Sequence, residues 1–252
     1  MSHRSVITLL TDFGRTDSYV AEMKGVVLSR APDATIVDVT HDVPVGDRAA
    51  AQYVLGRVWE RFPPGTVHLV VVDPGVGSAR RAVAIAAQGR FFVGPDNGVF
   101  TPVLAHARVV ALSVPAEAAP TFHGRDVFAP AAAALAVGTP LDVLGTPVPD
   151  PMRWSPPGPR LEGGDVVGTV LMVDHFGNLI TNIPRATVTD GAVVIVGARA
   201  VGSLRQTFAD VASGELLAYV GSGGTLEIAV RDGSAADRLG VGRDAVVRVA
   251  RD

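Results

Sequence analysis

One short stretch constrains the fold of this chain more than any other. Four apolar residues, Leu69–Val72, end abruptly at Asp73 and the turn sequence Pro74–Gly77. An unbroken, valine-rich apolar run predicts a strand that is buried on both faces, as in a parallel sheet. Ligands bind outside the carboxyl ends of such strands, which is where Asp73 lies. Arg80 can fold back toward this carboxylate, although the stretch alone also fits a strand-capping Asp beside two solvated arginines.

The same pattern recurs along the first 150 residues. Strand-like and helical segments alternate, which predicts a parallel sheet with right-handed crossovers. Two further apolar segments, 6–10 and 90–93, again end in an acidic residue beside a glycine turn. We therefore expect three carboxylates to lie along one edge of the sheet: Asp12, Asp73 and Asp96. The sequence also predicts helices at 19–30, 47–62 and 128–137, and strands at 35–39, 67–72, 81–87 and 109–114.

The composition of the chain changes near residue 155. Six prolines between Thr146 and Pro159 predict a stiff, extended linker. Beyond them, short strand-like runs separated by glycine or polar turns predict a small antiparallel barrel or sandwich. The predicted fold is an α/β domain with a mostly parallel sheet, then a linker, then an all-β, barrel-like domain, at residues 1–150, 151–159 and 160–252. The predicted strands of the second domain are 165–173, 193–196, 216–220, 225–230 and 245–249, with a helix near 234–239.

Composition narrows the classes of function. With 48% hydrophobic and 19% charged residues, the chain should fold as a globular protein. Its net charge is −3 and its only basic cluster is Arg80–Arg81, which argues against nucleic acid as a partner. The sequence has no cysteine, which excludes disulfides and thiolate chemistry. No apolar run approaches the ~20 residues that span a bilayer, and we see no signal-peptide pattern, so we expect a soluble, cytoplasmic protein without a membrane partner.

The carboxylates at the strand ends are the first candidate for chemistry. Asp12, Asp17, Asp73 and Asp96, with Asn97 beside the last, could bind a ribose diol, a metal or a cationic substrate. Each could equally hold its own turn. Metal hydrolysis is a weaker alternative: His41, Asp42 and His123 add further ligand types, but no pair of ligands within one segment has metal-like spacing.

Two loops supply the other candidates. His123 stands beside a glycine and two charged residues, a setting in which histidine can hydrogen bond or transfer a proton. In the second domain, Phe176 and Asn178 flank a glycine within Asp174–Asn182. An aromatic ring and an amide so spaced could stack on a purine and read its edge, or belong to an ordinary turn.

Together, five segments resemble the S-adenosyl-L-methionine (SAM) hydroxide adenosyltransferases, which hydrolyse SAM to adenosine and L-methionine and are related to the SAM-dependent fluorinase and chlorinase. These segments are Thr11–Gly14, Val72–Gly77 with Arg80, Gly94–Gly98, Thr121–Asp126 and Asp174–Asn178. The resemblance covers nearly the whole chain. It implies an N-terminal α/β domain, a C-terminal β-barrel and a homotrimer, with SAM bound between the N-terminal domain of one subunit and the C-terminal domain of the next.

The resemblance also implies roles for single residues. Asp73, Arg80 and His123 match an Asp-Arg-His set that handles water. The halogenating relatives carry a tyrosine where this chain has Asp73, so the resemblance favours hydrolysis. The remaining matches imply substrate binding: Asp12 at the ribose hydroxyls, Asp17 at the methionine amine, Phe176, Asn178 and Phe208 at adenine, Ser222 at methionine, and Asp96, Asn97 and Asp174 elsewhere on the substrate.

The chemistry of SAM fits these roles. Its sulfonium leaves C5′ as a neutral thioether, so the reaction needs no metal, cofactor or covalent intermediate. The site must supply a desolvated water in line with the C5′–S bond. Arg80 would stabilise hydroxide character, while Asp73 and His123 hold the water and accept its proton; which of the two is the final acceptor stays open. A non-catalytic SAM or adenosine sensor and a SAM-dependent halogenase are the alternatives.

Overall fold

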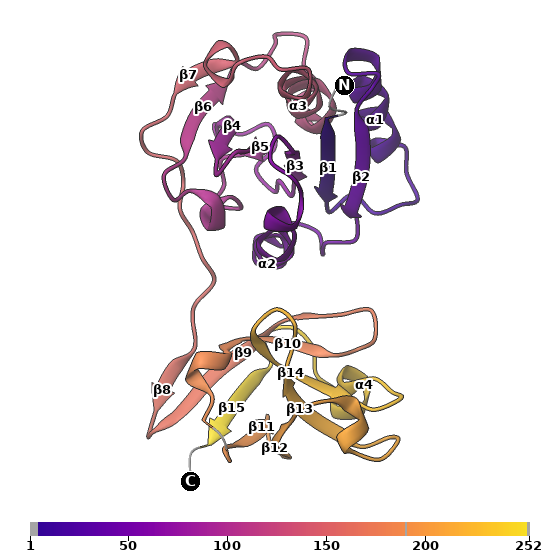
Figure 1. The fold of residues 1–252 in the computed structure, drawn as a ribbon, viewed down its shortest axis with the longest axis vertical. Coiled ribbons are helices and arrows are strands. Elements are labelled where there is room, and N and C mark those ends of the chain that lie inside the picture. Colours follow the sequence, from indigo (N-terminus) through magenta and orange to yellow (C-terminus); the bar gives the residue numbers. More distant parts are fainter. Residues whose placement is uncertain (1–4, 190, 251–252) are drawn as a thin grey trace. The chain divides into compact units, whose positions relative to one another are not determined.

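The structure is a computed structural model that describes residues 5–189 and 191–250 of the 252-residue chain (Figure 1). The chain divides into two compact units, Met1–Ser155 and Pro156–Asp252. Residues 151–159 form no helix or strand. None of the helices in the described residues is long and apolar enough to cross a membrane.

The N-terminal unit is built on one sheet. Its strands are β1 (Val6–Thr11), β2 (Thr35–Thr40), β3 (Val67–Val71), β4 (Ala82–Ala87), β5 (Arg90–Pro95), β6 (Arg108–Leu112) and β7 (Gly145–Pro147). They lie in the order β2–β1–β3–β5–β4–β6–β7. The β1–β2, β1–β3 and β3–β5 pairs are parallel, whereas β4 is antiparallel to both β5 and β6. Because β6 therefore runs with β5, only β4 and β7 oppose the rest, and the predicted mostly parallel sheet is confirmed.

The reversal at β4 is one of the exceptions in this mostly parallel sheet. Strands β4 and β5 are joined by only Gln88 and Gly89, whose φ angles are 49° and 74°. Two successive residues with positive φ form the tight turn that suits the twist of an antiparallel hairpin. A crossover helix cannot fit in a two-residue connection, so this pair has to be antiparallel.

Helices cover both faces of this sheet (Figure 1). Helices α1 (Tyr19–Arg30) and α3 (Ala129–Ala136) pack on the face that carries Leu9, Leu69 and Val71. Helix α2 (Arg48–Val58) packs on the other face, with Leu10, Val70 and Val72. Since neighbouring residues of one strand point to opposite faces, covering both faces requires the unbroken apolar runs seen in the sequence. The helix predicted at 47–62 ends in a short 3-10 turn, Trp59–Arg61.

The C-terminal unit is a closed barrel. Its strands are β8 (Arg160–Glu162), β9 (Asp165–Val173), β10 (Leu179–Pro184), β11 (Val193–Val196), β12 (Arg199–Arg205), β13 (Leu216–Val220), β14 (Thr225–Val230) and β15 (Val246–Ala250). They pair in the order β10–β14–β13–β12–β11–β15–β9–β8, and a β9–β10 pairing closes the ring. The predicted barrel-like domain is thus confirmed. Leu179, Leu226, Ile228 and Val247 lie in its buried core.

Candidate functional site

The carboxyl ends of three neighbouring parallel strands form the edge where the candidate residues of the N-terminal unit gather. Asp12, Asp73 and Asp96 follow the ends of β1, β3 and β5. These strands are adjacent in the sheet, in the order β1–β3–β5. The structure therefore brings the three carboxylates to one edge, as the sequence predicts.

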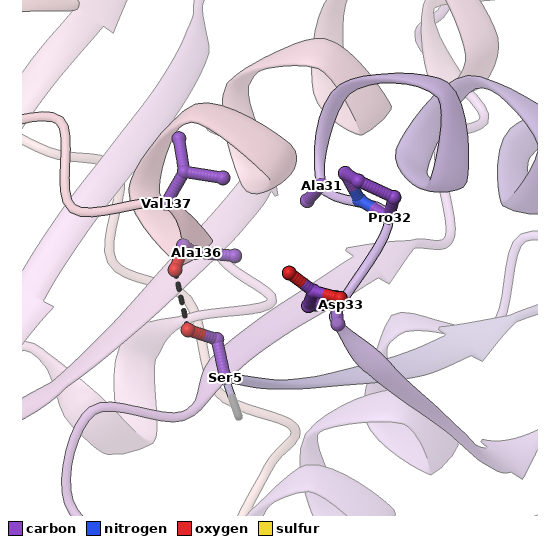
Figure 2. A pocket seen from close by; sticks show the side chains of 7 residues that line it. Ser5, Ala31, Pro32, Asp33, Ala136 and Val137 are labelled. Atoms are coloured by element: carbon purple, nitrogen blue, oxygen red, sulfur yellow. Dashed lines mark hydrogen bonds between the residues drawn. The ribbon is translucent and has the colours of Figure 1, made fainter. Parts of the chain in front are cut away.

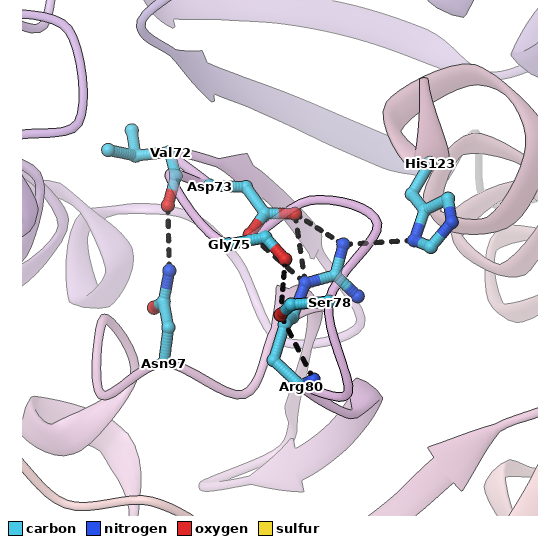
Figure 3. A network of polar contacts seen from close by, with 7 residues as sticks. All are labelled: Val72, Asp73, Gly75, Ser78, Arg80, Asn97 and His123. Atoms are coloured by element: carbon cyan, nitrogen blue, oxygen red, sulfur yellow. Dashed lines mark hydrogen bonds and ion pairs between the residues drawn. The ribbon is translucent and has the colours of Figure 1, made fainter. Parts of the chain in front are cut away.

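The loop after β3 folds Arg80 back onto Asp73 (Figure 3). Arg80 Nε lies 3.0 Å from both carboxylate oxygens of Asp73, and Arg80 Nη2 donates a further bond to Oδ2. The turn needs glycine: Gly77 has a φ of 76°, and a Cβ there would lie 2.9 Å from the carbonyl oxygen of Pro120. The side chains of Arg80 and Asp73 are only 9% and 5% exposed, so the ion pair is shielded from water.

Arg80 also reaches His123 (Figure 3). Its Nη2 lies 3.0 Å from His123 Nδ1. A guanidinium can only donate, so Nδ1 accepts and the neutral imidazole carries its hydrogen on Nε2. Burial, and then the positive charge of Arg80, lower the pKa of His123. His123 directly precedes a single π-helical turn, Gly124–Phe128, that leads into α3.

One donor of this cluster has no hydrogen-bond partner among the described residues. Arg80 Nη1 is buried and unpaired, while its guanidinium carbon lies 5.3 Å from the ring centroid of Phe128. Leaving a buried donor unsatisfied costs stability. An oxygen atom of a small ligand or water would remove that cost.

Asp12 and Asp17 lie in the loop between β1 and α1. Asp12 is half-buried, and its Oδ2 accepts a hydrogen bond of 2.8 Å from the backbone nitrogen of Gly46. Burial raises the pKa of Asp12, and the negative charge of Asp73 acts in the same direction. Asp17 is exposed in the bend before α1. This edge therefore presents acidic groups to a cationic ligand.

Asp96 and Asn97 have structural partners. Asp96 accepts bonds of 2.7 Å from Arg81 Nε and 2.8 Å from the Met152 backbone nitrogen. Asn97 Nδ2 donates to the Val72 carbonyl at 2.9 Å, and Asn97 Oδ1 accepts from the Val99 backbone nitrogen at 3.1 Å. Both side chains fix the ends of the strands and the start of the proline-rich segment, and their contact with substrate stays a prediction.

The C-terminal unit carries its own cavity, of about 620 Å³. The predicted Asp174, Phe176, Asn178 and Phe208 line it. Asp174 Oδ1 accepts from the backbone nitrogens of Phe176 and Asn178, and Asp174 Oδ2 accepts from Asn178 Nδ2, each at 2.9 Å. Phe176 as a whole residue is 73% exposed. Asp174 thus shapes the turn that presents the ring and the amide.

Sequence reasoning missed four residues that line this cavity: Tyr219, Val230, Asp232 and Gly233. The ring of Tyr219 lies 5.1 Å from that of Phe208, centroid to centroid. A buried acidic residue in the otherwise apolar run of β14, Glu227, is the signal that could have pointed to Tyr219. The predicted Ser222 lies in the exposed turn between β13 and β14 and does not line the cavity.

Among the described residues, the candidate metal ligands do not gather into a metal site. In residues 5–189 and 191–250, no three His, Asp or Glu side chains are placed to hold a metal ion. His41 Nδ1 lies 2.9 Å from Thr11 Oγ1 and Asp42 pairs with Arg15. A smaller cavity of about 210 Å³ lies at the amino ends of β1 and β2, where Ser5 bonds the carbonyl of Ala136 (Figure 2).

Comparisons with known proteins match both units. Residues 7–145 match the SAM hydroxide adenosyltransferase N-terminal domain and residues 168–248 the C-terminal domain. The chain is 45% identical to the (R)-S-adenosyl-L-methionine hydrolase of Thermus thermophilus, covering 96% of this chain and 98% of that one. It is 41% identical to the hydrolase of the same name from Salinispora tropica, covering 93% and 94%. Fluorinases are more distant, at 31% to 33% identity.

A solved structure is similar over the same length. The crystal structure of an uncharacterized conserved protein from Thermotoga maritima superposes with a TM-score of 0.88 at 37% identity. The match covers 97% of this chain and 100% of that one. The likeness therefore extends over both the sheet-edge cluster and the barrel cavity.

Proposed function

The chain belongs to the SAM hydroxide adenosyltransferase family, and from this premise we propose that it hydrolyses SAM to adenosine and L-methionine. Water attacks C5′ of the ribose, the C5′–O bond forms as the C5′–S bond breaks, and the electron pair of the broken bond stays on sulfur as the thioether of methionine. One proton is released. The buried Asp73–Arg80–His123 cluster is the observation that carries this proposal.

Arg80 binds the attacking water in this mechanism. Its Nη1 is buried and has no partner in the described part of the chain, whereas its Nε and Nη2 are held by Asp73 and His123. A water oxygen on Nη1 would gain a charge-assisted hydrogen bond that strengthens as hydroxide character develops. A fixed donor in a shielded site stabilises such charge without rearrangement.

Asp73 accepts the proton and His123 orients Arg80. The Nδ1 lone pair of His123 already accepts from Arg80, and its Nε2 carries the hydrogen, so the neutral ring has no lone pair to offer. Carboxylate oxygens have more acceptor sites than the three bonds from Arg80 occupy. Asp73 is therefore the better placed base.

In this proposal the acidic edge binds the ribose and the methionine amine, and the barrel cavity binds adenine. Asp12 binds the ribose hydroxyls and Asp17 the methionine amine, since acidic groups suit a cationic sulfonium substrate. Phe176, Asn178 and Phe208 bind adenine, with Asp174 holding the turn. Ser222 contributes to the methionine site. Asp96 and Asn97 act by fixing the ends of the strands. No cofactor takes part.

The active assembly in this proposal is a homotrimer in the cytoplasm, with each site shared between neighbouring subunits. Exposed apolar side chains near the acidic edge, on two loops and at the start of α1, support a covered surface there: Val45 is 91% exposed, Tyr19 47% and Val76 37%. Exposed apolar groups around a polar site are typical of interaction surfaces.

Incubation of the purified chain with SAM in water enriched in ¹⁸O tests the reaction. We expect adenosine with the label at its 5′ oxygen, unlabelled methionine, and an unchanged rate after treatment with a strong chelator. Asp73→Asn should form adenosine at least about 100-fold more slowly than the parent. Tight binding of SAM without turnover would instead identify a sensor, and a 5′-halo-5′-deoxyadenosine product with added halide would identify a halogenase.

A further inference from the structure

The cavity of the C-terminal unit is lined by one aromatic residue, Tyr219, to which the proposed function assigns no role. Tyr219, on β13, lines this cavity beside Phe208, and the two rings are tilted by 54° at a centroid distance of 5.1 Å. The hydroxyl of Tyr219 donates a hydrogen bond of 2.7 Å to Oε2 of Glu227. The ring is therefore anchored at its far end.

Glu227 is an unusual residue for its position. It lies on β14, directly opposite Tyr219 in the strand pairing, and is only 6% exposed. Its strand neighbours Leu226 and Ile228 are fully buried. Burying a carboxylate costs free energy that an apolar side chain would not, so the stability of the barrel does not account for it. Its bond to the Tyr219 hydroxyl is a specific use for the group.

The carboxylate also fills the space beside Gly221. A Cβ at Gly221 would lie 1.9 Å from Glu227 Oε1, so only glycine fits here without moving the carboxylate. Gly221 opens the turn that carries Ser222, closed by a 2.9 Å bond from the Gly224 nitrogen to the Gly221 carbonyl. Glu227 thus adjoins both the Tyr219 wall and the turn proposed to serve methionine.

We propose that Tyr219 is a wall of the adenine site and that Glu227 is the positioning residue that holds its ring in place. The inference rests on the proposed function only for the identity of the base. An aromatic ring increases binding affinity by stacking on a base. A ring that is fixed before binding loses less conformational freedom when the ligand binds. The bond to Glu227 supplies that fixation.

Calorimetric binding of adenosine to the full chain tests this inference. Tyr219→Ala should weaken binding by about tenfold or more, the scale expected for loss of one stacking ring. Tyr219→Phe and Glu227→Leu should each weaken it by a few-fold, and the double variant no further, because both remove the same bond. Glu227→Gln keeps an acceptor and should bind like the parent, while Gly221→Ala should resemble Glu227→Leu. Tyr53→Phe, which removes a hydroxyl bonded to Arg57 on α2, is the matched control.

Two outcomes separate this inference from the proposed reaction. If adenosine binds to the parent and more weakly to the variants while SAM is not hydrolysed, the inference about Tyr219 and Glu227 is supported and the proposed hydrolysis is refuted. If SAM is hydrolysed but folded Tyr219→Ala and Glu227→Leu bind adenosine as the parent does, the inference is wrong. Should Glu227→Leu fail to fold, Tyr219→Phe and Glu227→Gln decide. A parent chain that binds no adenosine would overturn the inference, whereas the proposed reaction is judged by SAM turnover alone.

Discussion

Arg80 donates one hydrogen bond to His123, and the direction of that bond sets the state of the imidazole. The 3.0 Å contact joins Arg80 Nη2 to His123 Nδ1, so the ring is neutral with its hydrogen on Nε2. Burial disfavours the charged ring, and protonation of Nδ1 would also break the contact and set two positive groups against each other, so burial and then Arg80 lower the pKa of His123. His123 therefore orients the arginine in its neutral state.

Removing any member of the cluster should abolish most of the turnover. We expect Asp73→Asn, Arg80→Ala and His123→Ala each to lower kcat by at least about 100-fold, with KM changed by only a few-fold, and the double variant Asp73→Asn/His123→Ala to be no slower than the worse single variant. Steady-state kinetics with SAM checks this. Asp33→Asn, an exposed carboxylate at the distant cavity (Figure 2), should keep the parental rate. Near-parental turnover in any two of the three would refute the assignment.

The rate should depend on pH through His123. Because burial and the charge of Arg80 lower the pKa of His123, its ring is protonated less readily than an ordinary histidine, and kcat/KM should fall only at pH values below the ordinary titration of histidine. His123→Asn retains an acceptor near the Nδ1 position and does not titrate, so it should keep more activity than His123→Ala and lose the acidic limb. A pH profile of kcat/KM, with circular dichroism to verify folding, makes the comparison. An unchanged acidic limb in His123→Asn would assign that limb to another group.

The sequence was sufficient for most of the helices and strands and for the shared edge, because both follow from local patterns. Helix α1 has its predicted bounds of 19–30, and the parallel pairing of β1, β3 and β5 brings Asp12, Asp73 and Asp96 together. The Gln88–Gly89 turn could have revealed the hairpin, because two residues between strand-like runs are a hairpin signal.

Local sequence patterns could not predict contacts between segments that are far apart in the chain. Nothing local links Arg80 to His123, and the π-helical turn after His123 leaves no periodic signature in so short a stretch. Strands β7, β8, β10 and β12 were not predicted, and β10 (Leu179–Pro184) follows the Asp174–Asn178 turn directly. Tyr219 was missed because its role depends on Glu227 in the next strand.

A buried histidine away from the site should make the protein sensitive to acid. His68 is fully buried, stacks on Phe92 and bonds Thr8, and burial followed by Arg90 lowers its pKa to about 4. Between pH 6.5 and 4 the unfolded chain binds a proton that native His68 does not, so stability falls as the pH falls through this window. At 1.36 kcal/mol per pKa unit, the free energy of unfolding falls by about 3 kcal/mol over the whole window.

Urea unfolding across this pH range measures the effect of His68. His68→Asn, which keeps an acceptor for Thr8 but cannot titrate, should show a shallower fall in the free energy of unfolding. His106→Asn changes an exposed histidine and should follow the parent. Equal slopes for His68→Asn and the parent would mean that other groups cause the acid sensitivity.

The barrel cavity should distinguish adenosine from inosine. Asp174 can only accept when ionised, so the amide nitrogen of Asn178 must face it and the amide oxygen is left to accept from a ligand. Adenine offers a 6-amino donor, whereas hypoxanthine presents an oxygen. Leaving a buried acceptor unpaired costs about 1–3 kcal/mol, so inosine should bind about 5- to 150-fold more weakly. Calorimetry with both nucleosides tests this, and Asn178→Leu should remove the preference; equal affinities in the parent would contradict the assigned orientation.

The division of candidate residues between two units leads to a prediction about assembly. The carboxylates and the water-handling cluster belong to Met1–Ser155, and the base cavity belongs to Pro156–Asp252. A site made from both units can be completed within one chain or between neighbours. Asp73→Asn damages only the first half and Asn178→Ala only the second, so each variant alone should be inactive whichever arrangement holds.

Mixing these two inactive variants after dissociation and reassembly separates the arrangements. If each site joins the first unit of one subunit to the second unit of its neighbour, random exchange pairs two intact halves in about one site in four. We therefore expect recovery to about a quarter of the parental rate at an equal mixing ratio, with the recovered fraction falling as either variant is put in excess. Mass spectrometry of an isotope-labelled variant verifies that subunits have exchanged. Exchange without recovery would show that every site lies within a single chain, because in that case no mixture can place two intact halves together.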